Sequence, residues 1–537
     1  MAALAAAGGL AVLGAGGPAM ASGLGSQATP ASATFAAQAY APLRVTAAHR
    51  VTADDPVPSR GFLGPAMLID PSNPKVMFAA TVEARTRVCY LLRSTDGGST
   101  WSTLANLPTL SSYPFCFNTS GGVTQSPIAF GRNHALYYAL VGYSNQDGGA
   151  DSKADISVEV AKSTDLGNTW TTVLVENARG KTGTATESNY PVASVAVDTS
   201  GPQDVVVTGW RQGHPQQPTA VSNSLIGIST DGGANYSQVN LNNFSTLTLT
   251  NAGTSYKGTF STPHVAAGDG VIYAGTSVSY PTAAKAPSQP YYVGYSTNHG
   301  QSFTMVPVTP AGAGGQVLSW SPLGGPQGTA LLVYSYEPNV TQGNTDIYFQ
   351  RSTDGGKTWS APAKLNDDDP SLSITHGLPN INVAPNGRID VAWDDFRNAQ
   401  SFADDIYYTY STDDGMTWAH NIRASDQVIN LNIGISNNSD VRQPPGIGSA
   451  NNAAVFGWAD TRLGNQTTQT QDVFASVVQF KPITTGGSNT VKYFTAGAIG
   501  LVVAGLIVLI IALSRRRKGS PGAPPPVARE REPVGVA

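Results

Sequence analysis

Residues 352–359 read Ser-Thr-Asp-Gly-Gly-Lys-Thr-Trp, and this octapeptide recurs in varied form along the 537-residue chain. Five other copies begin at Ser94, Ser163, Ser229, Ser296 and Ser411, so that successive copies lie 56 to 69 residues apart. Repetition of a short pattern at a near-constant spacing indicates a repeat architecture, in which every copy marks one structural unit. The fold is therefore predicted to be a series of similar units.

The residue types in the octapeptide suit a hairpin turn. The third residue can accept hydrogen bonds from backbone N–H groups, the fifth is Gly and tolerates a positive φ, and the eighth is an aromatic residue that can bury a large apolar area. A residue repeated in every unit cannot mark a single active site, so a structural role is predicted for the third position, which is occupied by Asp96, Asp165, Asp231, Asn298, Asp354 and Asp413.

The octapeptide resembles the Asp-box, or bacterial neuraminidase repeat, of sialidase-type β-propellers. The third copy departs from it in Tyr236, which replaces Trp, and the fourth departs in Asn298 and Phe303. The resemblance covers nearly all of residues 41–485. It implies an all-β propeller and, if the protein is an enzyme, a glycoside hydrolase of the exo-α-sialidase type.

The number of blades is predicted to be seven, each with four strands. Alternating strand pairs open near Gly64, Gln125, Tyr190, Thr262, Val317, Leu378 and Arg442, which is one more opening than there are boxes. Seven units at the mean box spacing fill residues 41–485, whereas the alternative, six blades, leaves about one unit over. The last blade lacks an outer strand, which residues 41–46 are predicted to supply beside residues 472–478, because this closure removes an exposed edge.

The two ends of the chain indicate export and a membrane anchor. Residues 495–513 form an uncharged apolar run, long enough to span a bilayer, and the sequence Arg515-Arg516-Arg517-Lys518 follows it. We predict a leader over 1–40 with a cleavage-like stretch at Ala19–Ala21, the extracytoplasmic propeller over 41–485, a linker over 486–493, a single-pass transmembrane helix over 494–514 and a basic, Pro-rich cytoplasmic tail over 515–537.

Composition limits the partners and supports one disulfide. The formal net charge of −4 lacks the basic excess that nucleic-acid binding requires. Cys89 and Cys116 are the only cysteines, and in an oxidising compartment they are predicted to pair, the alternative being two free buried thiols. No cofactor or metal is predicted. The run 367–369 of three Asp could bind structural Ca²⁺, although a solvated acidic turn is the preferred interpretation.

Candidate site residues lie where the propeller topology predicts the end opposite the boxes. In a blade of four antiparallel strands, this end holds the loops between second and third strands and the connections between blades. The resemblance implies arginines for a substrate carboxylate, a Tyr–Glu nucleophile pair and an Asp acid/base. The candidates are Arg60, Arg211, Arg397, Arg442, Arg462 and Asp460 for substrate binding, and Glu187, Tyr190 and Asp394 for catalysis.

A second motif, Trp-x-Asp-x-Arg, occurs at 393–397 and 458–462 and has two interpretations. It could line a pocket for an acidic sugar, or it could be a structural ion pair that locks adjacent blades. The first predicts that Arg397→Ala abolishes binding of anionic glycans with little loss of stability, and the second predicts loss of stability.

Two functions remain open from the sequence. One is a cell-surface, sialidase-like propeller that recognises, and hydrolyses, external acidic glycans. The other is a non-catalytic propeller that binds a glycan or a surface protein. A propeller fold alone does not decide between them, because the same fold hosts many functions.

Overall fold

A computed structural model provides the structure of the protein. It describes most of residues 31–482, with the longer gaps at 105–114, 117–125, 145–155, 179–193, 213–222, 281–290, 309–315, 338–343 and 436–442. The chain divides into two units, residues 1–481 and 482–537. The second unit is outside the described residues except for Pro482, and so is the predicted transmembrane helix over 494–514. In the described ranges, no helix has the length and apolar character needed to cross a bilayer.

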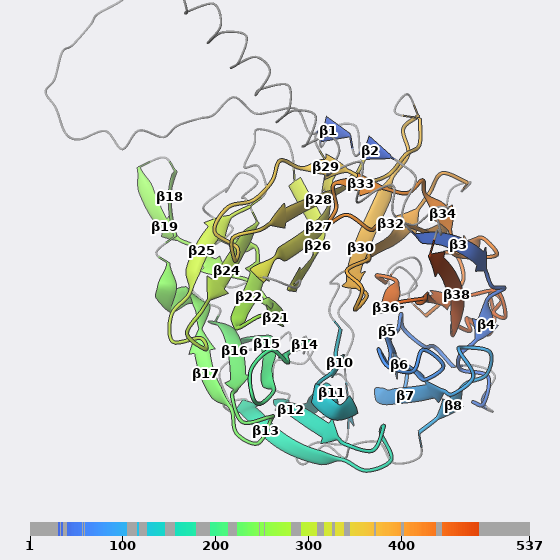
Figure 1. Ribbon diagram of the computed structural model, residues 1–537, viewed down its shortest axis with the longest axis horizontal. Helices are drawn as coiled ribbons and strands as arrows, with labels where there is room; N and C mark the ends of the chain where they lie inside the picture. Colours follow the sequence, from blue (N-terminus) through green and yellow to red (C-terminus); the bar gives the residue numbers. More distant parts are fainter. Residues whose placement is uncertain are drawn as a thin grey trace, which may run out of the picture. The chain divides into compact units, whose positions relative to one another are not determined.

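Seven sheets of at least four antiparallel strands follow one another around a ring (Figure 1). Blade 1 contains β5 (Ala66–Ile69), β6 (Met77–Glu83), β7 (Val88–Ser94) and β8 (Ser102–Thr103). Blade 2 contains β10 (Ile128–Phe130), β11 (Leu136–Tyr143), β12 (Ile156–Ser163) and β13 (Thr171–Ala178), with β9 (Phe115–Cys116) paired to β11. Blade 3 contains β14 (Ser194–Asp198), β15 (Val205–Gln212), β16 (Asn223–Ser229) and β17 (Ser237–Asn240).

The remaining blades keep the same order of strands. Blade 4 contains β21 (His264–Gly268), β22 (Val271–Thr276), β24 (Tyr292–Ser296) and β25 (Thr304–Pro307), and blade 5 contains β26 (Gln316–Gly324), β27 (Ala330–Glu337), β28 (Asp346–Ser352) and β29 (Ala363–Lys364). Blade 6 contains β30 (His376–Val383), β31 (Ile389–Asp395), β32 (Ala403–Ser411) and β34 (Ile422–Arg423), with β35 (Ile429–Asn430) also paired to β32. Blade 7 contains β36 (Gly446–Ala450), β37 (Ala453–Asp460) and β38 (Asp472–Pro482).

Short elements join or extend the blades. They are the 3₁₀ turns η1 (Arg132–His134) and η3 (Leu241–Phe244), the hairpin β18 (Thr248–Asn251) with β19 (Thr254–Lys257), the pair β20 (Thr259–Phe260) with β23 (Val278–Ser279), and β33 (Thr417–Trp418). The prediction of an all-β propeller with seven blades is confirmed.

The N-terminal segment closes the ring along its outer strands. Strand β3 (Tyr40–Val45) is the outer strand of blade 7 beside β38, and β4 (His49–Arg50) pairs with the same strand, as predicted for this region. The segment also reaches other blades, because β1 (Ala31–Ser32) pairs in parallel with β29 and β2 (Thr34–Phe35) with β33. These pairs begin ahead of residue 41, where the sequence predicts the propeller to start.

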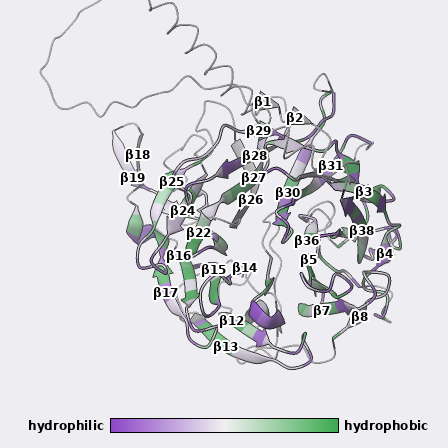
Figure 2. Ribbon diagram, in the orientation of Figure 1, coloured by the Kyte–Doolittle hydropathy of each residue, from purple (hydrophilic) through white to green (hydrophobic). Residues whose placement is uncertain are grey.

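The blades pack face to face through buried apolar side chains. The cluster between blades 7 and 1 combines Met67 and Ile69 of the innermost strand of blade 1 with Val455 and Val477 of blade 7. Figure 2 shows hydrophobic residues along strands such as β16 and β22, whose side chains are almost all buried. Burial of both faces explains why β22 is a nearly continuous apolar run.

Every Asp-box forms the same closed turn between the third and fourth strands of its blade. In the box at 352–359, Ser352 Oγ accepts from Gly356 N at 2.8 Å, and Asp354 Oδ1 accepts from Thr358 N at 2.9 Å. The Trp359 indole N–H donates to the Gly356 carbonyl at 3.2 Å. Gly356 has a φ of 89°, and a Cβ there would lie 3.1 Å from the Tyr273 ring of the preceding blade, so both the turn and the packing require Gly.

A basic residue ahead of three of the boxes ties its blade to the next one. The residue before the first Ser donates to the carbonyl of the fourth residue in the following box, in the pairs Arg93 to Leu166 at 2.9 Å, Lys162 to Gly232 at 2.8 Å and Arg351 to Asp414 at 2.6 Å. The boxes therefore hold the ring together at one end as well as closing their own turns.

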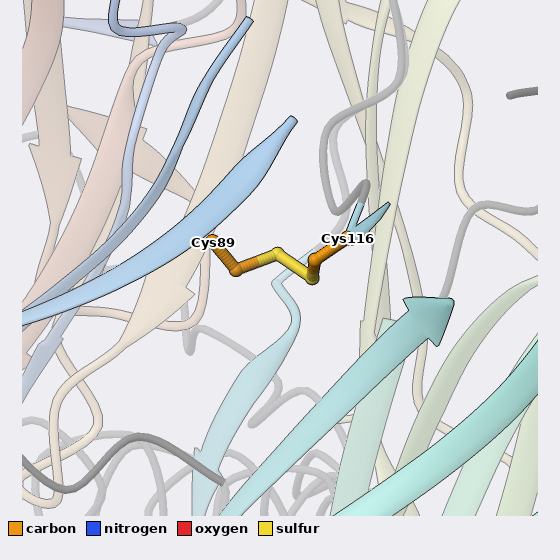
Figure 3. Close-up of a disulfide and its surroundings, with 2 residues drawn as sticks. All are labelled: Cys89 and Cys116. Atoms are coloured by element: carbon orange, nitrogen blue, oxygen red, sulfur yellow. A yellow bond between two sulfur atoms is a disulfide. The ribbon is translucent and has the colours of Figure 1, made fainter. Parts of the chain in front are cut away.

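The predicted disulfide is present and joins blades 1 and 2 (Figure 3). Cys89 lies in β7, and Cys116 lies in β9, which pairs with β11 of blade 2. Their Cα atoms are 5.5 Å apart, within the range for an unstrained bridge. Because 27 residues separate the two cysteines, the bond fixes the long connection between the first two blades.

The box carboxylates should make the free energy of unfolding depend on pH in the acid range. Hydrogen bonds from Thr and Ser side chains and backbone N–H groups lower the pKa of Asp354 to about 2, from an ordinary value of 3.8. The folded-state pKa is depressed, so its contribution to stability is present above pH 3.8 and is lost as the pH falls towards 2. We expect Asp354→Asn to flatten the decline in the free energy of unfolding between pH 5 and pH 2, measured by urea denaturation.

The fourth box supplies the matched reverse substitution. Asn298 Oδ1 already accepts from Ser302 N at 3.0 Å, which shows that an amide fits the turn. Asn298→Asp should therefore fold and make the acid decline steeper. Equal slopes in both variants and the unaltered protein would contradict this role for the box carboxylates.

Candidate functional site

At the end opposite the boxes, the two Trp-x-Asp-x-Arg motifs adopt the same conformation. In the first, the Trp393 indole N–H donates to Asp395 at 2.9 Å, and the Arg397 backbone N–H donates to the same carboxylate at 2.9 Å. In the second, Trp458 and Arg462 donate to Asp460 in the same way, each at 2.8 Å. In both copies the guanidinium also binds its own Asp, at 2.8 and 2.7 Å. The motif is thus a closed turn at the end of a second strand.

The register of this motif assigns Asp395, and not Asp394, as the partner of Arg397. Asp394 lies in β31 opposite Ile406, and it is 1% exposed. The sequence suggested Asp394 as a catalytic residue, but adjacent residues of a β-strand point to opposite faces, so its side chain lies on the other face of the strand from Asp395. Asp395 is therefore the counterpart of Asp460.

Each arginine also binds a carboxylate on the connection that leaves the preceding blade. Arg397 of blade 6 donates to Asp367 after blade 5 at 2.9 Å, and Arg462 of blade 7 pairs with Asp426 after blade 6 at 2.8 Å. The two guanidinium groups stack on rings of the third strands, Tyr407 and Phe474, each at 4.2 Å. Both arginines therefore lie between blades, which is the second of the two interpretations of this motif.

A further repeat, not recognised in the sequence, positions these carboxylates. Three outer strands end at a basic residue, which is followed by an apolar residue, a polar residue and, at once or three residues later, an Asp. The segments are Lys364-Leu365-Asn366-Asp367, Arg423-Ala424-Ser425-Asp426, and Arg50-Val51-Thr52 with Asp55. The basic residue pairs with a carboxylate near the start of the third strand, in Lys364–Asp346 at 2.9 Å, Arg50–Asp472 at 2.7 Å and Arg423–Asp405. The polar side chain accepts the N–H of the next residue along that strand, in Asn366–Ile347 at 2.9 Å, Ser425–Ile406 at 3.1 Å and Thr52–Val473 at 3.3 Å.

The same arrangement recurs between blades 7 and 1, with a change of arginine. Glu83 ends the second strand of blade 1 and is fully buried. It accepts from Gly61 N at 2.9 Å, and Arg60 lies 3.7 Å from it and 3.2 Å from Asp55. Arg85, which follows Glu83 at the spacing of the motif, donates to the Thr468 carbonyl of blade 7 at 3.0 Å. We refer to the three places, between blades 5 and 6, 6 and 7, and 7 and 1, as the junctions.

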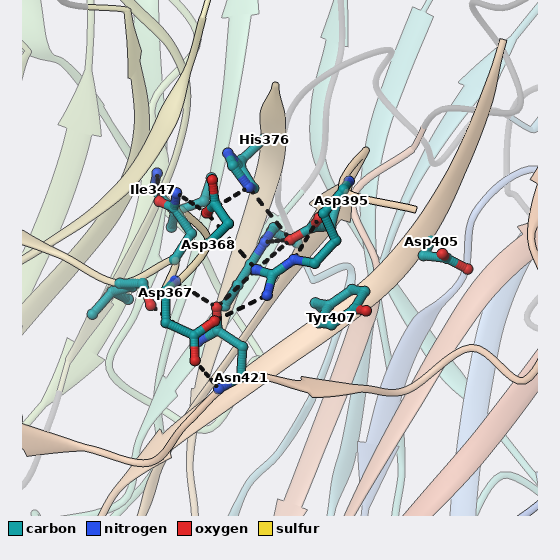
Figure 4. Close-up of polar contacts among 12 residues, drawn as sticks. Ile347, Asp367, Asp368, His376, Asp395, Asp405, Tyr407 and Asn421 are labelled. Carbon is teal, nitrogen blue, oxygen red and sulfur yellow. Dashed lines mark hydrogen bonds and ion pairs between the residues drawn. The ribbon is translucent and has the colours of Figure 1, made fainter. Parts of the chain in front are cut away.

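The junction between blades 5 and 6 holds the largest group of charged side chains (Figure 4). His376, fully buried at the start of β30, has its Nε2 3.1 Å from Asp368 and 3.5 Å from Asp395, and its Nδ1 2.9 Å from the Thr345 carbonyl. Asn366 donates to Asp368 at 2.6 Å. In the acidic run 367–369, Asp367 and Asp368 therefore make contacts within this junction.

Burial and hydrogen bonding act in opposite directions on these carboxylates. Burial alone would raise the pKa of Asp367, but the Asn421 backbone N–H and the Arg397 guanidinium hold the pKa below its usual value. Burial also opposes ionisation of Asp368, and hydrogen bonds from His376 and Asn366 again lower the pKa. Both groups remain anionic at neutral pH. Among the described residues, no group of three His, Cys, Asp or Glu side chains has an arrangement that could hold a metal ion.

The other predicted site residues are not brought into one cluster. Arg60, Arg397 and Arg462 occupy three different junctions. Arg211 lies in β15 of blade 3, opposite Ser224, and is 9% exposed. Glu187, Tyr190 and Arg442 lie outside the described residues, so the proposed nucleophile pair has no described position.

The junctions predict the effect of removing one arginine. Arg397→Ala leaves Asp367 and Asp395 without their shared cation, in a place where the Arg397 side chain is only 15% exposed. Loss of one member of a buried pair costs about 3–5 kcal/mol, and the partial exposure argues for the lower part of that range. We expect urea denaturation to show this loss, whereas Lys357→Ala, an exposed box residue, should change stability by less than about 0.5 kcal/mol. A loss for Arg397→Ala that is as small as the control would contradict the junction role.

Comparison with known proteins agrees with the repeat. The family model described as BNR/Asp-box repeat matches residues 350–361, which is the fifth box with its flanks. No curated protein has a sequence that matches the chain significantly.

Similar solved structures are distant in sequence. One is an α-L-arabinanase of Penicillium chrysogenum complexed with arabinobiose, 14% identical with a TM-score of 0.39, over 81% of this chain and 98% of that one. A second is an ulvan lyase of polysaccharide lyase family PL25, 10% identical with a TM-score of 0.45, over 81% and 96%. A third is the sialidase of Trypanosoma rangeli with the inhibitor DANA, 13% identical with a TM-score of 0.37, over 66% and 55%. The chain thus carries Asp-box repeats on a β-propeller of seven sheets.

Proposed function

We propose that the protein is a cell-surface propeller that binds glycans lacking a carboxylate and does not hydrolyse sialosides. The observation that carries the proposal concerns the three candidate arginines at the junctions. Each of them is paired with two carboxylates of the protein. These pairs are Arg60 with Asp55 and Glu83, Arg397 with Asp367 and Asp395, and Arg462 with Asp426 and Asp460. Glycans as the ligand class come from the resemblance of the boxes to those of sialidases.

The balance of charge argues against an acidic sugar at the junctions. Between blades 5 and 6, Arg397 and Lys364 face four carboxylates, those of Asp346, Asp367, Asp368 and Asp395. A sugar carboxylate is recognised by bidentate contacts with guanidinium groups that have donors to spare. At Arg397, hydrogen bonds to Asp395, Asp367 and Asn421 already engage Nε, Nη1 and Nη2. An added anion would meet a net negative junction.

Sialidase-type hydrolysis would require a different arrangement. Three arginines must converge on one carboxylate beside a Tyr–Glu pair, whereas the candidates Arg60, Arg397 and Arg462 lie at three different junctions. The hydrolase hypothesis therefore depends on Glu187, Tyr190 and Arg442. For this reason the binding function is the better supported of the two.

Membrane anchoring is a second part of the proposal and rests on the sequence. The apolar run 495–513 and the four cations at 515–518 support a single-pass helix with its C-terminal side in the cytoplasm. The full chain should stay with the membrane after alkaline carbonate extraction, and deletion of 494–537 should release it. Extraction of the full chain under these conditions would refute the anchor.

The binding function is tested with matched oligosaccharides and a sialoside substrate. The detergent-solubilised full chain should bind a neutral glycan from an oligosaccharide array, and the same core carrying a terminal sialic acid should bind at least about tenfold more weakly. It should release no fluorophore from a methylumbelliferyl sialoside. Turnover that is abolished by Glu187→Gln or Tyr190→Phe would establish the hydrolase instead, and a preference for the sialylated core would also contradict the proposal.

A further inference from the structure

We propose that the propeller stands on a lipid surface with the end that carries the boxes towards the headgroups, so that the opposite end faces outward. We refer to the two ends as the box end and the junction end. The inference rests on the proposed membrane anchor and adds an orientation to it. It starts from the direction of β38, the last described strand, which precedes the apolar run 495–513.

Strand β38 begins at the junction end. Its first residue, Asp472, lies opposite Asp460, the carboxylate of the second Trp-x-Asp-x-Arg motif. Asp472 also binds Arg50, which belongs to the repeated segment between blades 7 and 1, at 2.7 Å. The start of the strand is therefore fixed beside the junctions.

The same strand ends at the box end. Val477 packs against the first box, because a Cβ added to Gly98 would lie 3.0 Å from the Val477 side chain. The Phe480 N–H donates at 2.8 Å to the carbonyl of Asn452, in the turn between the first and second strands of blade 7. In a four-stranded antiparallel blade this turn lies at the same end as the box. The chain therefore leaves the propeller at the box end.

The length of chain after β38 decides which end can face the bilayer. Tyr493, two residues before the apolar run, is of a type enriched at the bilayer surface. The eleven residues 483–493 reach at most about 40 Å even when fully extended. Strand β38, with 11 residues, is itself about 35 Å long, and the loop 461–471 lies beyond its start.

Only one orientation leaves the connection unstretched. With the junction end on the bilayer, the connection would have to run back along the whole of β38 and past the loop 461–471, which takes up nearly all of its maximum reach. With the box end on the bilayer, the connection leaves the propeller already beside the headgroups. This orientation also presents the junction end to external ligands.

Two exposed side chains can report the two ends. Met416 is 59% exposed in the sixth box, and Leu463 is 54% exposed in the loop before β38 at the junction end. The two natural cysteines, Cys89 and Cys116, are joined in a disulfide. A single cysteine introduced at Met416 or Leu463 can therefore be labelled alone.

The test places the full chain in phosphatidylcholine vesicles in which part of the lipid carries a nitroxide quencher on its headgroup. Met416→Cys and Leu463→Cys carry the same fluorophore. Because the two ends lie about 35 Å apart along a blade, the label at Met416 should lose at least about twice as much fluorescence as the label at Leu463. A water-soluble nitroxide, added to the two variants in detergent, should quench both labels equally. Equal quenching in the vesicles, or stronger quenching at Leu463, would overturn the inference.

A longer connection tests the cause of the orientation. Insertion of about 20 Gly and Ser residues after Thr485 raises the maximum reach to about 110 Å, so the difference between the two labels should shrink. An unchanged difference would overturn the short connection as its cause. Flotation of the vesicles separates the two proposals. A chain that does not float refutes the anchor and the orientation together, whereas a chain that floats with both labels equally quenched refutes the orientation alone.

Discussion

The contact that fixes three of the seven blade interfaces is a carboxylate on the connection leaving one blade, which accepts a hydrogen bond or ion pair from an arginine at the next blade. A propeller is closed only if each blade is fixed to its neighbour, and apolar packing between sheets does not by itself set their relative height. Asp367 and Asp426 set the height of one blade relative to the next. Each lies on the connection that leaves one blade and binds an arginine that follows the second strand of the next blade. The same arginines bind Asp395 and Asp460, which are buried, and a buried charge is costly without a partner, so the geometry is strongly determined.

The sequence predicts the fold well because its signals are local. A turn of eight residues carries the whole Asp-box, and its recurrence alone indicates a propeller. The closing strand, the seven blades and the disulfide also follow from counting and from topology. The pairing of β1 with β29 of blade 5 and of β2 with β33 in blade 6 was not predicted, because these two-residue strands carry no alternating pattern.

The candidate site was less predictable because its partners are distant in the chain. Asp367 lies 30 residues before Arg397, and Asp426 lies 36 residues before Arg462, so neither pair has a local signal. The shared sequence at 364–367 and 423–426 is a signal that could have been found, since its basic, apolar, polar and acidic positions repeat in order. Arg60, Arg397 and Arg462 suggest anion binding by their residue type alone, but in the structure each of them is paired with carboxylates of the protein itself.

The central claim is that these arginines fix the junctions and do not bind the ligand. The most direct measurement is a double-mutant cycle between Arg397 and Asp367, with Arg397→Ala, Asp367→Ala and both changes compared by their free energies of unfolding. Because the two side chains form a hydrogen-bonded ion pair at 2.9 Å, the account predicts a coupling of at least about 1 kcal/mol. Additive effects, together with loss of anionic glycan binding in Arg397→Ala, would contradict it.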